Sequence, residues 1–492
     1  MSNPWKDPSV AQQQRALVDH QLAEKPWPPH FTALAEAVRA TQCPGEILEV
    51  GCASGYGREI LDRAGIEYRR FDGIDISPEA IRIANERYPE SQWIAGEFGA
   101  ATVMEKPVAD VVVDGCALMH VDDWRAHITA LCKASRRWVV LHRVPCGDDE
   151  TQRIHTQGYG QTFPAWFFDR EDIAATMQAS GFQLVSSIAA DGESRTLTFA
   201  KSRHFCSYAD GAYLGRLKAL HASMVRHCGP FELHVLAWKS DDESTAVATW
   251  CDENGIDCVT GRDFLDAHPE LELDKLPGPR RSYVEHMYTC GPRFVADVMD
   301  RTGEPCAYAD ADLYAFSSPE PFFAEAGGAP AAFVGHNFAP ASRGTPGPTV
   351  ESHAGPFGAL NVGLMVFNDQ RVAERWSDLV RGWCFSRCEL VGDRWQYADQ
   401  KFLEQLCDEF PACVVIKNEA AMVGPWNVNA RSLDLRDGVP YFGNRPIGFY
   451  HFSALQMGQH GQWSPTRPEY RISERVVSIL YSGYVREIDG PF

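Results

Sequence analysis

A glycine-rich turn between an apolar strand and a helix is the feature that most constrains how this chain folds. Residues 46–57 have the sequence Glu-Ile-Leu-Glu-Val-Gly-Cys-Ala-Ser-Gly-Tyr-Gly, and a helical pattern follows through Ile60 and Leu61. Glycine lets the backbone turn tightly and approach a ligand closely. A helix that begins after such a turn points its free N–H groups at that ligand. The segment therefore predicts a ligand-binding βα junction in an α/β domain.

Two acidic residues stand beside this turn in the sequence. Glu49 comes just before the glycines, and Asp75 lies near the end of the next predicted strand, residues 68–77. A carboxylate at the end of that strand can accept hydrogen bonds from ribose hydroxyls. We expect Glu49 to bind other polar groups of the same ligand, so the pair predicts a nucleoside site.

Strands and helices continue to alternate up to residue 200. Their order predicts a doubly wound, mostly parallel sheet that an antiparallel hairpin closes. Strands are expected at residues 91–95, 109–115, 138–143, 182–189 and 195–200, and helices at 123–134 and 170–180.

These motifs together resemble the class I S-adenosylmethionine-dependent methyltransferases over about residues 30–200. The fourth-strand motif of that family matches residues 110–121, Asp-Val-Val-Val-Asp-Gly-Cys-Ala-Leu-Met-His-Val. The resemblance implies a Rossmann-like fold and S-adenosylmethionine as cofactor. Ala53 stands where many members carry glycine. By the same resemblance the cofactor contacts are Glu49, Gly51, Ala53, Gly55, Asp75, Ile76, Glu97 and Phe98.

His120, which ends the fourth-strand motif, is our candidate for the catalytic base, ahead of His142 and His155. Histidine can take a hydroxyl proton near neutral pH as the methyl group transfers. Two alternatives stay open: a structural histidine, and a transfer that needs only proximity and alignment.

Residues 154–168 are rich in aromatics and glycine and are expected to form a loop. The segment resembles the acceptor-side loop of methyltransferases found with bacterial surface-polysaccharide enzymes. Its aromatic faces suit a sugar ring. A hydrophobic lid that packs on its own domain is the alternative.

The pattern of strand and helix restarts near residue 202. Strands are expected at residues 203–208, 231–238 and 255–260, with a helix at 211–227. A new βαβ unit after a hairpin-closed sheet indicates a domain boundary. We therefore expect one domain at residues 1–201 and another at 202–492.

Asp310 and Asp312 follow the apolar strand that begins at Cys306. Their i, i+2 spacing places both side chains on one face of an extended segment. Two convergent carboxylates suit Mn²⁺ or Mg²⁺, and either ion can hold a diphosphate. Such a site would bind a nucleotide-sugar donor.

Four further motifs follow in a fixed order. They are Asn361-Val-Gly, Asp399-Gln400, residues 424–427 (Gly-Pro-Trp-Asn) and His451. The ordered set resembles retaining glycosyltransferases of the GT-A, glycogenin-like kind over about residues 203–460. The loop at 424–427 departs from the better-known members.

That second resemblance implies a role for each matching residue. Asp310, Asp312 and His451 would ligate the divalent metal. Asn361, Asp399 and Gln400 would line the donor sugar and acceptor, with Gln400 steadying a cationic sugar during same-face attack. Tyr208 would stack on the base of a UDP- or GDP-sugar.

Composition limits the partners and the compartment. A net charge of −20 over 492 residues argues against binding nucleic acid through its phosphates. No apolar stretch approaches the roughly 20 residues that span a bilayer, and the N-terminus has no apolar signal-peptide core. We expect a cytoplasmic protein, and leave peripheral membrane contact and oligomeric state open.

The leading interpretation is a bifunctional enzyme that methylates a hydroxyl and transfers a hexosyl-type sugar, acting on a glycan or glycoside acceptor. Bacterial surface-polysaccharide biosynthesis is the expected setting. Two alternatives remain: only one half is catalytic, with the methyltransferase half serving as a binding or scaffolding module, or the protein tailors natural-product glycosides.

Overall fold

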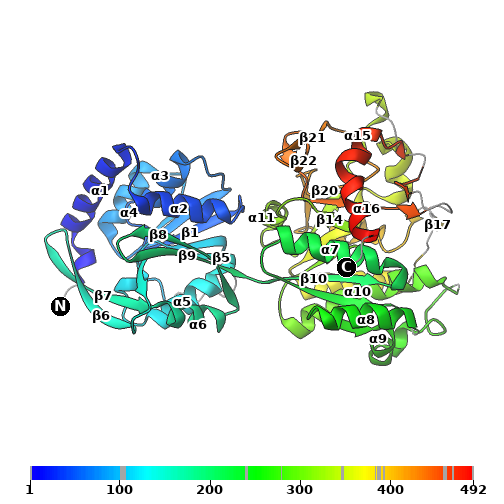
Figure 1. Ribbon diagram of the computed structural model, residues 1–492, viewed down its shortest axis with the longest axis horizontal. Helices are drawn as coiled ribbons and strands as arrows, with labels where there is room; N and C mark the ends of the chain where they lie inside the picture. Colours follow the sequence, from blue (N-terminus) through cyan, green and yellow to red (C-terminus); the bar gives the residue numbers. More distant parts are fainter. Residues whose placement is uncertain are drawn as a thin grey trace. The chain divides into compact units, whose positions relative to one another are not determined.

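The computed structural model describes residues 3–99, 107–238, 242–278, 280–344, 348–382, 384, 389–391, 394–457, 463–467 and 470–489. The chain divides into two compact units, Met1–Ser202 and Arg203–Phe492, shown as ribbons in Figure 1. Within the described ranges, no helix is both long and apolar enough to cross a membrane.

The N-terminal unit is a mixed α/β sheet with helices on both faces. The strand order is β3-β2-β1-β4-β5-β7-β6, and β9 pairs antiparallel with β5 and with β8. The strands are β1 Glu46–Val50, β2 Arg70–Asp75, β3 Trp93–Ala95, β4 Ala109–Asp114, β5 Ser135–Gly147, β6 Gln152–Gly158, β7 Gln161–Asp169, β8 Phe182–Asp191 and β9 Ser194–Lys201.

Figure 1 shows α2 and α3 on one side of this sheet and α5 and α6 on the other. The helices are η1 Pro4–Lys6, α1 Pro8–Ala23, α2 Pro29–Ala40, α3 Tyr56–Arg63, α4 Pro78–Arg87, η2 Leu118–His120, α5 Trp124–Ala134 and α6 Arg170–Gln178. A core of fully buried aliphatic side chains from β4 and β5, with Ile128 and Leu131 of α5, holds the layers together.

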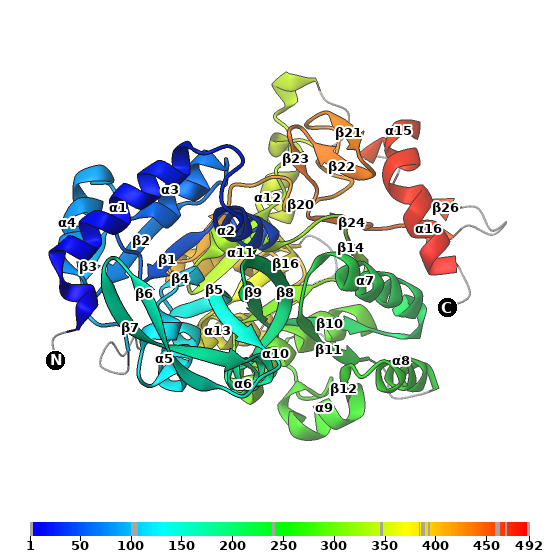
Figure 2. The same ribbon diagram turned by 60° about the vertical axis from the view of Figure 1, so that its left-hand side comes forward.

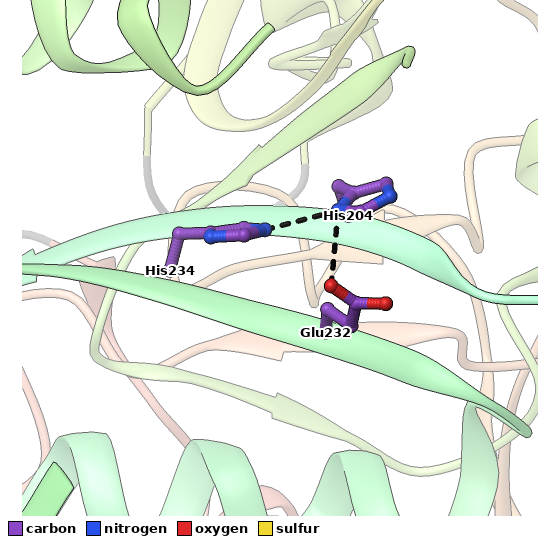
Figure 3. Close-up of side chains that lie close together, drawn as sticks. All are labelled: His204, Glu232 and His234. Carbon is purple, nitrogen blue, oxygen red and sulfur yellow. Dashed lines mark hydrogen bonds and ion pairs between the residues drawn. The ribbon is translucent and has the colours of Figure 1, made fainter. Parts of the chain in front are cut away.

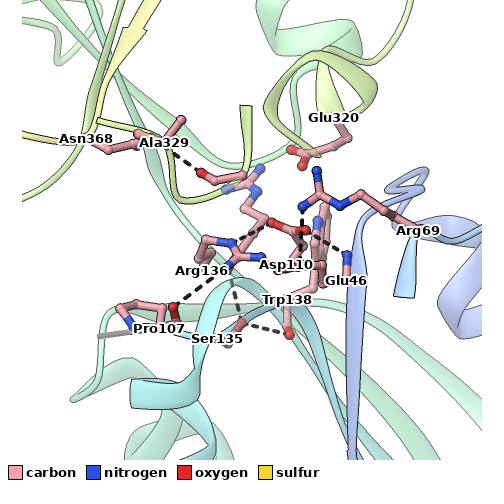
Figure 4. A network of polar contacts seen from close by, with 12 residues as sticks. Glu46, Arg69, Pro107, Asp110, Ser135, Arg136, Trp138, Glu320, Ala329 and Asn368 are labelled. Carbon is pink, nitrogen blue, oxygen red and sulfur yellow. Dashed lines mark hydrogen bonds and ion pairs between the residues drawn. The ribbon is translucent and has the colours of Figure 1, made fainter. Parts of the chain in front are cut away.

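An ion-pair network fixes the amino ends of β1, β4 and β5 (Figure 4). Arg136 Nε donates to Asp110 Oδ1 at 2.7 Å, and its Nη2 donates to Glu46. The other carboxylate oxygen of Asp110 accepts the Glu46 N–H at 2.8 Å. The network joins three parallel strands at their amino ends. It therefore fixes how far each strand extends toward the opposite edge of the sheet, where their carboxyl ends lie.

The expected loop at residues 154–168 is instead the hairpin β6–β7. Tyr159 and Gly160 both have positive φ, 50° and 71°. Two such residues form the tight turn that matches strand twist. Phe163, Ala165 and Phe168 are buried, so β7 packs apolar side chains into the unit's interior.

The C-terminal unit has a second α/β sheet, ordered β12-β11-β10-β13-β16-β15-β19. Strand β16 runs antiparallel to both neighbours, and the other pairings are parallel. The strands are β10 Arg203–Ala209, β11 Phe231–Ala237, β12 Asp257–Thr260, β13 Cys306–Ala309, β14 Leu313–Ala315, β15 Ala331–Gly335, β16 Leu360–Phe367, β17 Glu389–Val391, β18 Arg394–Gln396, β19 Val414–Ile416, β20 Met422–Val423, β21 Leu433–Arg436, β22 Val439–Phe442, β23 Arg445–Pro446, β24 Phe449–His451, β25 Gln456–Met457 and β26 Trp463–Ser464.

Two apolar clusters cover this sheet, with α7, α8 and α11 on one face and α9, α10, α13 and α14 on the other. The helices are η3 Gly211–Tyr213, α7 Leu214–His227, α8 Asp242–Glu253, α9 Gly261–Ala267, η4 Pro269–Leu271, α10 Tyr283–Thr302, α11 Glu320–Ala326, η5 Ala341–Arg343, η6 Val350–Ala354, α12 Gly355–Phe357, α13 Gln370–Gly382, α14 Phe402–Glu409, α15 Glu474–Val476, η8 Val477–Tyr481 and α16 Ser482–Asp489.

A small sheet, β14-β24-β20, lies beside the main sheet, and Figure 2 shows β14 and β24 next to one another near α7. Leu313 pairs with His451 in this sheet. The pairing carries a residue from late in the chain to the end of the segment that holds Asp310 and Asp312.

Candidate active sites

In the N-terminal unit, the glycine-rich turn leaves β1 and enters α3 in left-handed backbone conformations. Gly51 and Gly55 have φ values of 74° and 77°, and Ala53 has a φ of 47°. Glycine adopts these values without strain. A Cβ atom on Gly51 would also lie 2.7 Å from the Cβ of Ala117. Gly51 is therefore required by both its conformation and the space around it.

Asp75 ties this turn to the end of β2. Its Oδ2 accepts the Ala53 N–H at 2.8 Å, and its Oδ1 accepts the Ser77 N–H at 2.8 Å. Burial raises the pKa of Asp75, although the two N–H donors oppose the shift. Because each carboxylate oxygen has a further lone pair, Asp75 can hold the turn and still accept from a ligand hydroxyl.

Glu49 is fully buried beneath the turn. A Cβ atom on Gly57 would lie 2.3 Å from its Oε1, and one on Gly115 would lie 3.0 Å away. These two glycines make the space for the carboxyl group. Its Oε2 has no hydrogen-bond partner in the described part of the chain, and burial, with Asp75 and Asp114 nearby, raises the pKa of Glu49 well above its usual value.

A cavity of about 1040 Å³ opens beside the turn. The predicted cofactor contacts in its wall are Gly51, Ala53, Asp75, Ile76, Glu97 and Phe98. Glu49 and Gly55 do not line the cavity, so a direct contact between Glu49 and a ligand stays a prediction. The cavity is large enough for a nucleoside cofactor together with part of an acceptor.

His120 also lines the cavity, at the end of η2. Its Nδ1 lies 3.1 Å from the Pro164 carbonyl oxygen, so Nδ1 carries the proton and Nε2 of the neutral ring keeps its lone pair. Burial lowers the pKa of His120, which favours that neutral form. The rings of Trp5 and Phe163 pack against the imidazole at 4.8 and 6.1 Å, and these contacts fix its position.

The two weaker base candidates lie in different settings. His142 is buried, its Nδ1 lies 3.0 Å from Thr196 Oγ1, and burial lowers its pKa to about 3. His155 is exposed on β6. Of these three histidines, His120 alone lines the cavity described here.

Sequence reasoning missed His127, a further histidine of the cavity wall. Its Nε2 lies 2.8 Å from Asp114 Oδ2, and its Nδ1 has no partner among the residues that the structure describes. Phe98 packs on its ring at 5.8 Å. His127 lies in an amphipathic helix, where histidine at an inward position gives no signal of its own.

In the C-terminal unit, Asp310, Asp312 and His451 converge. His451 Nε2 lies 3.0 Å from Asp312 Oδ1 and 3.4 Å from Asp310 Oδ2. One candidate ligand atom from each of the three lies within 4.8 Å of the others. The Phe452 N–H donates to the Asp312 carbonyl at 3.0 Å, so backbone pairing as well as charge holds the group together.

The charges of this group are strongly coupled. Burial favours the neutral imidazole of His451, but Asp312 and Asp310 together outweigh it and raise the pKa of His451. Burial likewise opposes ionisation of Asp312, but the imidazole lowers its pKa. Burial raises the pKa of Asp310, whose Oδ1 accepts the Tyr308 hydroxyl at 2.5 Å. Two carboxylates and an imidazole with converging acceptor atoms fit a divalent cation.

Asn361 lies on β16 next to this group, with its amide engaged inside the protein. Its Oδ1 accepts the Gly363 N–H at 2.7 Å, and its Nδ2 lies 2.9 Å from His336 Nε2. A Cβ atom on Gly363 would lie 2.7 Å from His451 Nδ1. Asn361 therefore shapes the strand that supports His451, and a contact with a donor sugar stays a prediction.

Asp399 and Gln400 lie in a turn before α14, which begins at Phe402, three residues later than Asp399. Asp399 Oδ2 is buried without a partner in the described ranges, and burial raises the pKa of Asp399 to about 8. Gln400 Nε2 donates to the Phe357 carbonyl at 2.8 Å.

Tyr208 is buried at the end of β10. Its ring packs 5.5 Å from that of Tyr308, and a Cβ atom on Gly291 of α10 would lie 2.6 Å from its Cε1. Protein atoms thus pack closely around the ring, and stacking on a base stays a prediction.

Two residues beside Asp310, Asp312 and His451, together called the Asp310 group from here on, make contacts that the sequence did not reveal. Arg216 of α7 helps to lower the pKa of Asp312, and its Nη2 donates to the Leu455 carbonyl at 2.6 Å. The Trp426 ring lies 5.3 Å from that of His451, and its buried Nε1 has no acceptor in the parts of the chain described. The motif around Trp426 was recognised, but an arginine in an amphipathic helix gave no signal.

Comparison with known proteins identifies the first of these two regions. Residues 18–187 match the family model described as methyltransferase domain, so the chain carries a methyltransferase domain in its N-terminal unit.

Individual proteins resemble this chain only at low sequence identity. The uncharacterized protein YfnD of Bacillus subtilis is 25% identical over 287 residues, covering 57% of this chain and 87% of that protein. The O-methyltransferase cnsE of Penicillium expansum is 27% identical over 194 residues, which is 37% of this chain and 64% of that protein. Among solved structures, the amino pentose methyltransferase of calicheamicin biosynthesis from Micromonospora echinaspora is 16% identical over 39% of this chain and 97% of its own, with a TM-score of 0.30. The magnesium protoporphyrin IX methyltransferase of Synechocystis is 17% identical over 39% of this chain and 86% of its own, with a TM-score of 0.28.

Proposed function

We propose that the N-terminal unit transfers a methyl group from S-adenosylmethionine to a hydroxyl group. The observation that carries the proposal is the cavity that joins the turn held by Asp75 to the lone pair of His120 Nε2. When bound, S-adenosylmethionine supplies an activated methyl group. The O-methyltransferase named among the relatives supports a hydroxyl as the methylated group.

In this proposal each residue acts on its own part of the ligands. Asp75 orients a ribose through its remaining lone pairs, while Gly51 lets the backbone approach the cofactor. His120 takes the acceptor proton at Nε2, and the Pro164 carbonyl holds the resulting imidazolium through Nδ1–H. The aromatic side chains of Trp5 and Phe163 exclude water from that side of the ring.

The test is calorimetric titration with S-adenosylmethionine followed by transfer of labelled methyl to a panel of glycosides. We expect one cofactor per chain and label on a hydroxyl oxygen. Label on nitrogen would show that the acceptor group is an amine and not a hydroxyl. A protein that does not bind the cofactor would contradict the proposal.

We further propose that the C-terminal unit is a retaining GT-A glycosyltransferase that uses a nucleotide sugar. The convergence of Asp310, Asp312 and His451 carries this proposal. A divalent cation held there, Mn²⁺ or Mg²⁺, supplies positive charge for the departing diphosphate. Arg216 adds a fixed positive charge near Asp312. The buried Nε1–H of Trp426 can donate a hydrogen bond to a phosphate oxygen.

The remaining residues would bind the sugar and the acceptor. Asp399 and Gln400 face the sugar in this proposal, and Tyr208 contacts the base of a UDP- or GDP-sugar. Gln400 steadies the cationic sugar while the acceptor attacks the face that the diphosphate leaves.

Nucleotide release from a panel of UDP-, GDP- and dTDP-sugars, with Mn²⁺ and with EDTA, tests this second activity. We expect one donor to be hydrolysed slowly and only with the metal. Release that EDTA leaves unchanged would contradict the metal-dependent mechanism.

The fusion suggests that both units modify one glycan, in the cytoplasm, within surface-polysaccharide biosynthesis. A methyltransferase unit that binds the cofactor and only scaffolds is the second candidate. The transfer of labelled methyl described above distinguishes a catalytic unit from a scaffolding one, because a scaffolding unit binds the cofactor without turnover.

A further inference from the structure

A cluster of three metal-binding residue types lies on the C-terminal unit's main sheet, apart from Asp310. His204 is on β10, and Glu232 and His234 are on the neighbouring parallel strand β11. His204 pairs with Glu232 in the strand register, and residues i and i+2 of a strand share a face. Figure 3 shows the three side chains turned toward one another.

The distances between their ligand atoms suit one ion. His204 Nδ1 lies 3.0 Å from His234 Nε2 and 3.7 Å from Glu232 Oε2. A candidate ligand atom of each residue lies within 4.8 Å of the others. Tetrahedral zinc bonds of about 2.0–2.2 Å to nitrogen and oxygen place neighbouring ligand atoms roughly 3.3–3.5 Å apart.

The second nitrogen of His234 has a partner that prepares the ring for a metal. His234 Nδ1 lies 2.6 Å from Asp257 Oδ2, and Arg301 Nη2 donates to the same oxygen at 2.6 Å. The carboxylate fixes the proton on Nδ1, so the lone pair of Nε2 points at His204. A carboxylate behind a histidine in this way orients the ligand and raises its basicity at metal centres.

We propose that His204, Glu232 and His234 bind a transition-metal ion, Zn²⁺ by preference, with a fourth position open to solvent. Two imidazoles and one carboxylate form the donor set of zinc sites that keep an open position. Glu232 has a side chain that is 56% exposed, whereas that of His234 is 5% exposed. The ion would therefore lie at the rim of the sheet, within reach of water.

Without the ion, the same atoms form a proton chain. The proton of His204 Nδ1 bridges to His234 Nε2, whose own Nδ1–H donates to Asp257. When an ion takes the lone pair of His204 Nδ1, the proton of the neutral ring moves to Nε2 by exchange with water, and the ring stays neutral. A protonated imidazole has no lone pair for the ion, so zinc binding should weaken as pH falls.

This site is separate from the Asp310 group. His204 pairs with Cys306 on β13, and Asp310 follows Cys306 by four residues. At about 3.3 Å per strand residue, the two levels are roughly 13 Å apart along the sheet. The donor sets differ too, because two histidines select zinc while two aspartates favour harder ions.

The experiment is titration of the full chain with Zn²⁺, followed by Co²⁺, whose absorption bands report four-coordinate geometry. The variants are Glu232→Gln, on an exposed side chain, and His234→Asn, with Glu253→Gln on α8 as the matched control. Asp310→Asn/Asp312→Asn removes any zinc bound at the other group. We expect that double variant and Glu253→Gln to retain one tight Zn²⁺ and its Co²⁺ bands.

For Glu232→Gln and His234→Asn we expect at least about 100-fold weaker binding, and for the orienting variant Asp257→Asn about 10–100-fold. A tight zinc that survives both ligand variants, or one that Asp310→Asn/Asp312→Asn alone abolishes, would overturn the proposal. Glu232→Gln keeps the test valid if His234→Asn fails to fold, because the Glu232 side chain is mostly exposed.

Discussion

In the N-terminal unit, the groups that surround the cavity come from turns at the ends of adjacent strands, and backbone N–H groups orient the key carboxylate, Asp75. In the C-terminal unit, Asp310 and Asp312 meet His451 through the pairing of β14 with β24, and charged side chains interact directly. The first site is shaped mainly by space and backbone geometry. The second is shaped by charged side chains, and burying such side chains costs free energy.

The difference has a physical consequence. A cavity of the first kind is already formed by packing and accepts a ligand with little change in charge. The Asp310 group places two buried carboxyl groups beside one imidazole, and burial opposes ionisation of both carboxyl groups, so a bound cation would stabilise their charged forms. Substitutions should therefore damage the first site through steric fit and the second through lost charge.

The largest effect in the N-terminal unit should come from His120→Ala. Removing a general base costs about 100- to 10,000-fold in rate, and we expect this loss in kcat with KM for S-adenosylmethionine nearly unchanged. Because burial lowers the pKa of His120 from 6.5, the wild-type rate should fall only below pH 6.5. A pH–rate profile checks this, and an unaltered acidic limb in His120→Ala would assign the limb to another group.

Gly57→Ala tests whether space decides the first site. The new methyl group would lie 2.3 Å from Glu49 Oε1, so we expect destabilisation of about 1–3 kcal/mol by overpacking. Calorimetric unfolding measures it. Gly483→Ala in α16 is the matched control, because no atom lies within 4 Å of its added Cβ in the described structure. Helix propensity should make that control neutral or stabilising by up to about 1 kcal/mol.

Acid should weaken the N-terminal unit through His142. Burial, with His30 and Arg143 nearby, holds the folded-state pKa at about 3, whereas the unfolded value is about 6.5. Below pH 6.5 the unfolded state therefore binds a proton that the folded state does not, and stability falls as pH falls, by about 2 kcal/mol at pH 5.

Unfolding scans between pH 7 and pH 5 test this for wild type and His142→Asn. The variant should lose part of the pH slope. His155→Asn, at an exposed position of β6, should keep the whole slope. Equal slopes in wild type and His142→Asn would show that another group is responsible.

The smallest effect should come from Trp426→Phe. Phenylalanine keeps the packing against His451 but removes the Nε1 donor that has no acceptor in the described chain. If a phosphate oxygen accepts from that donor, KM for the nucleotide sugar should rise about 10-fold. Trp250→Phe on α8 is the control, and an unchanged KM in Trp426→Phe would leave Trp426 with a packing role.

The two regions also differed in how far the sequence foretold them. The glycine-rich turn is local, so the spacing of Gly51, Ala53 and Gly55 predicted the junction that the structure shows. The α/β alternation around it was likewise predictable. The hairpin β6–β7 was not, because aromatic and glycine-rich composition suggested a loop while the turn at Tyr159 and Gly160 makes two strands.

Long-range pairing limited prediction in the C-terminal unit. The order of Asp310, Asn361 and His451 suggested one site, but spacing in sequence could not show that Leu313 pairs with His451. Arg216 gave no signal because helix periodicity explains it equally well. His204 and Glu232 meet across two neighbouring strands. The spacing of residues within a short stretch of sequence does not predict such a pair.

One measurement tests most directly whether the chain holds two sites of different chemistry. Nucleotide release from the preferred sugar donor with Mn²⁺ is compared between wild type and Asp310→Asn/Asp312→Asn, with S-adenosylmethionine affinity measured on the same samples. We predict a loss of release of about 1,000-fold or more, since a metal stabilises the departing charge by several kcal/mol. The cofactor affinity should stay unchanged. Release that persists in the double variant would contradict a metal site at Asp310 and Asp312.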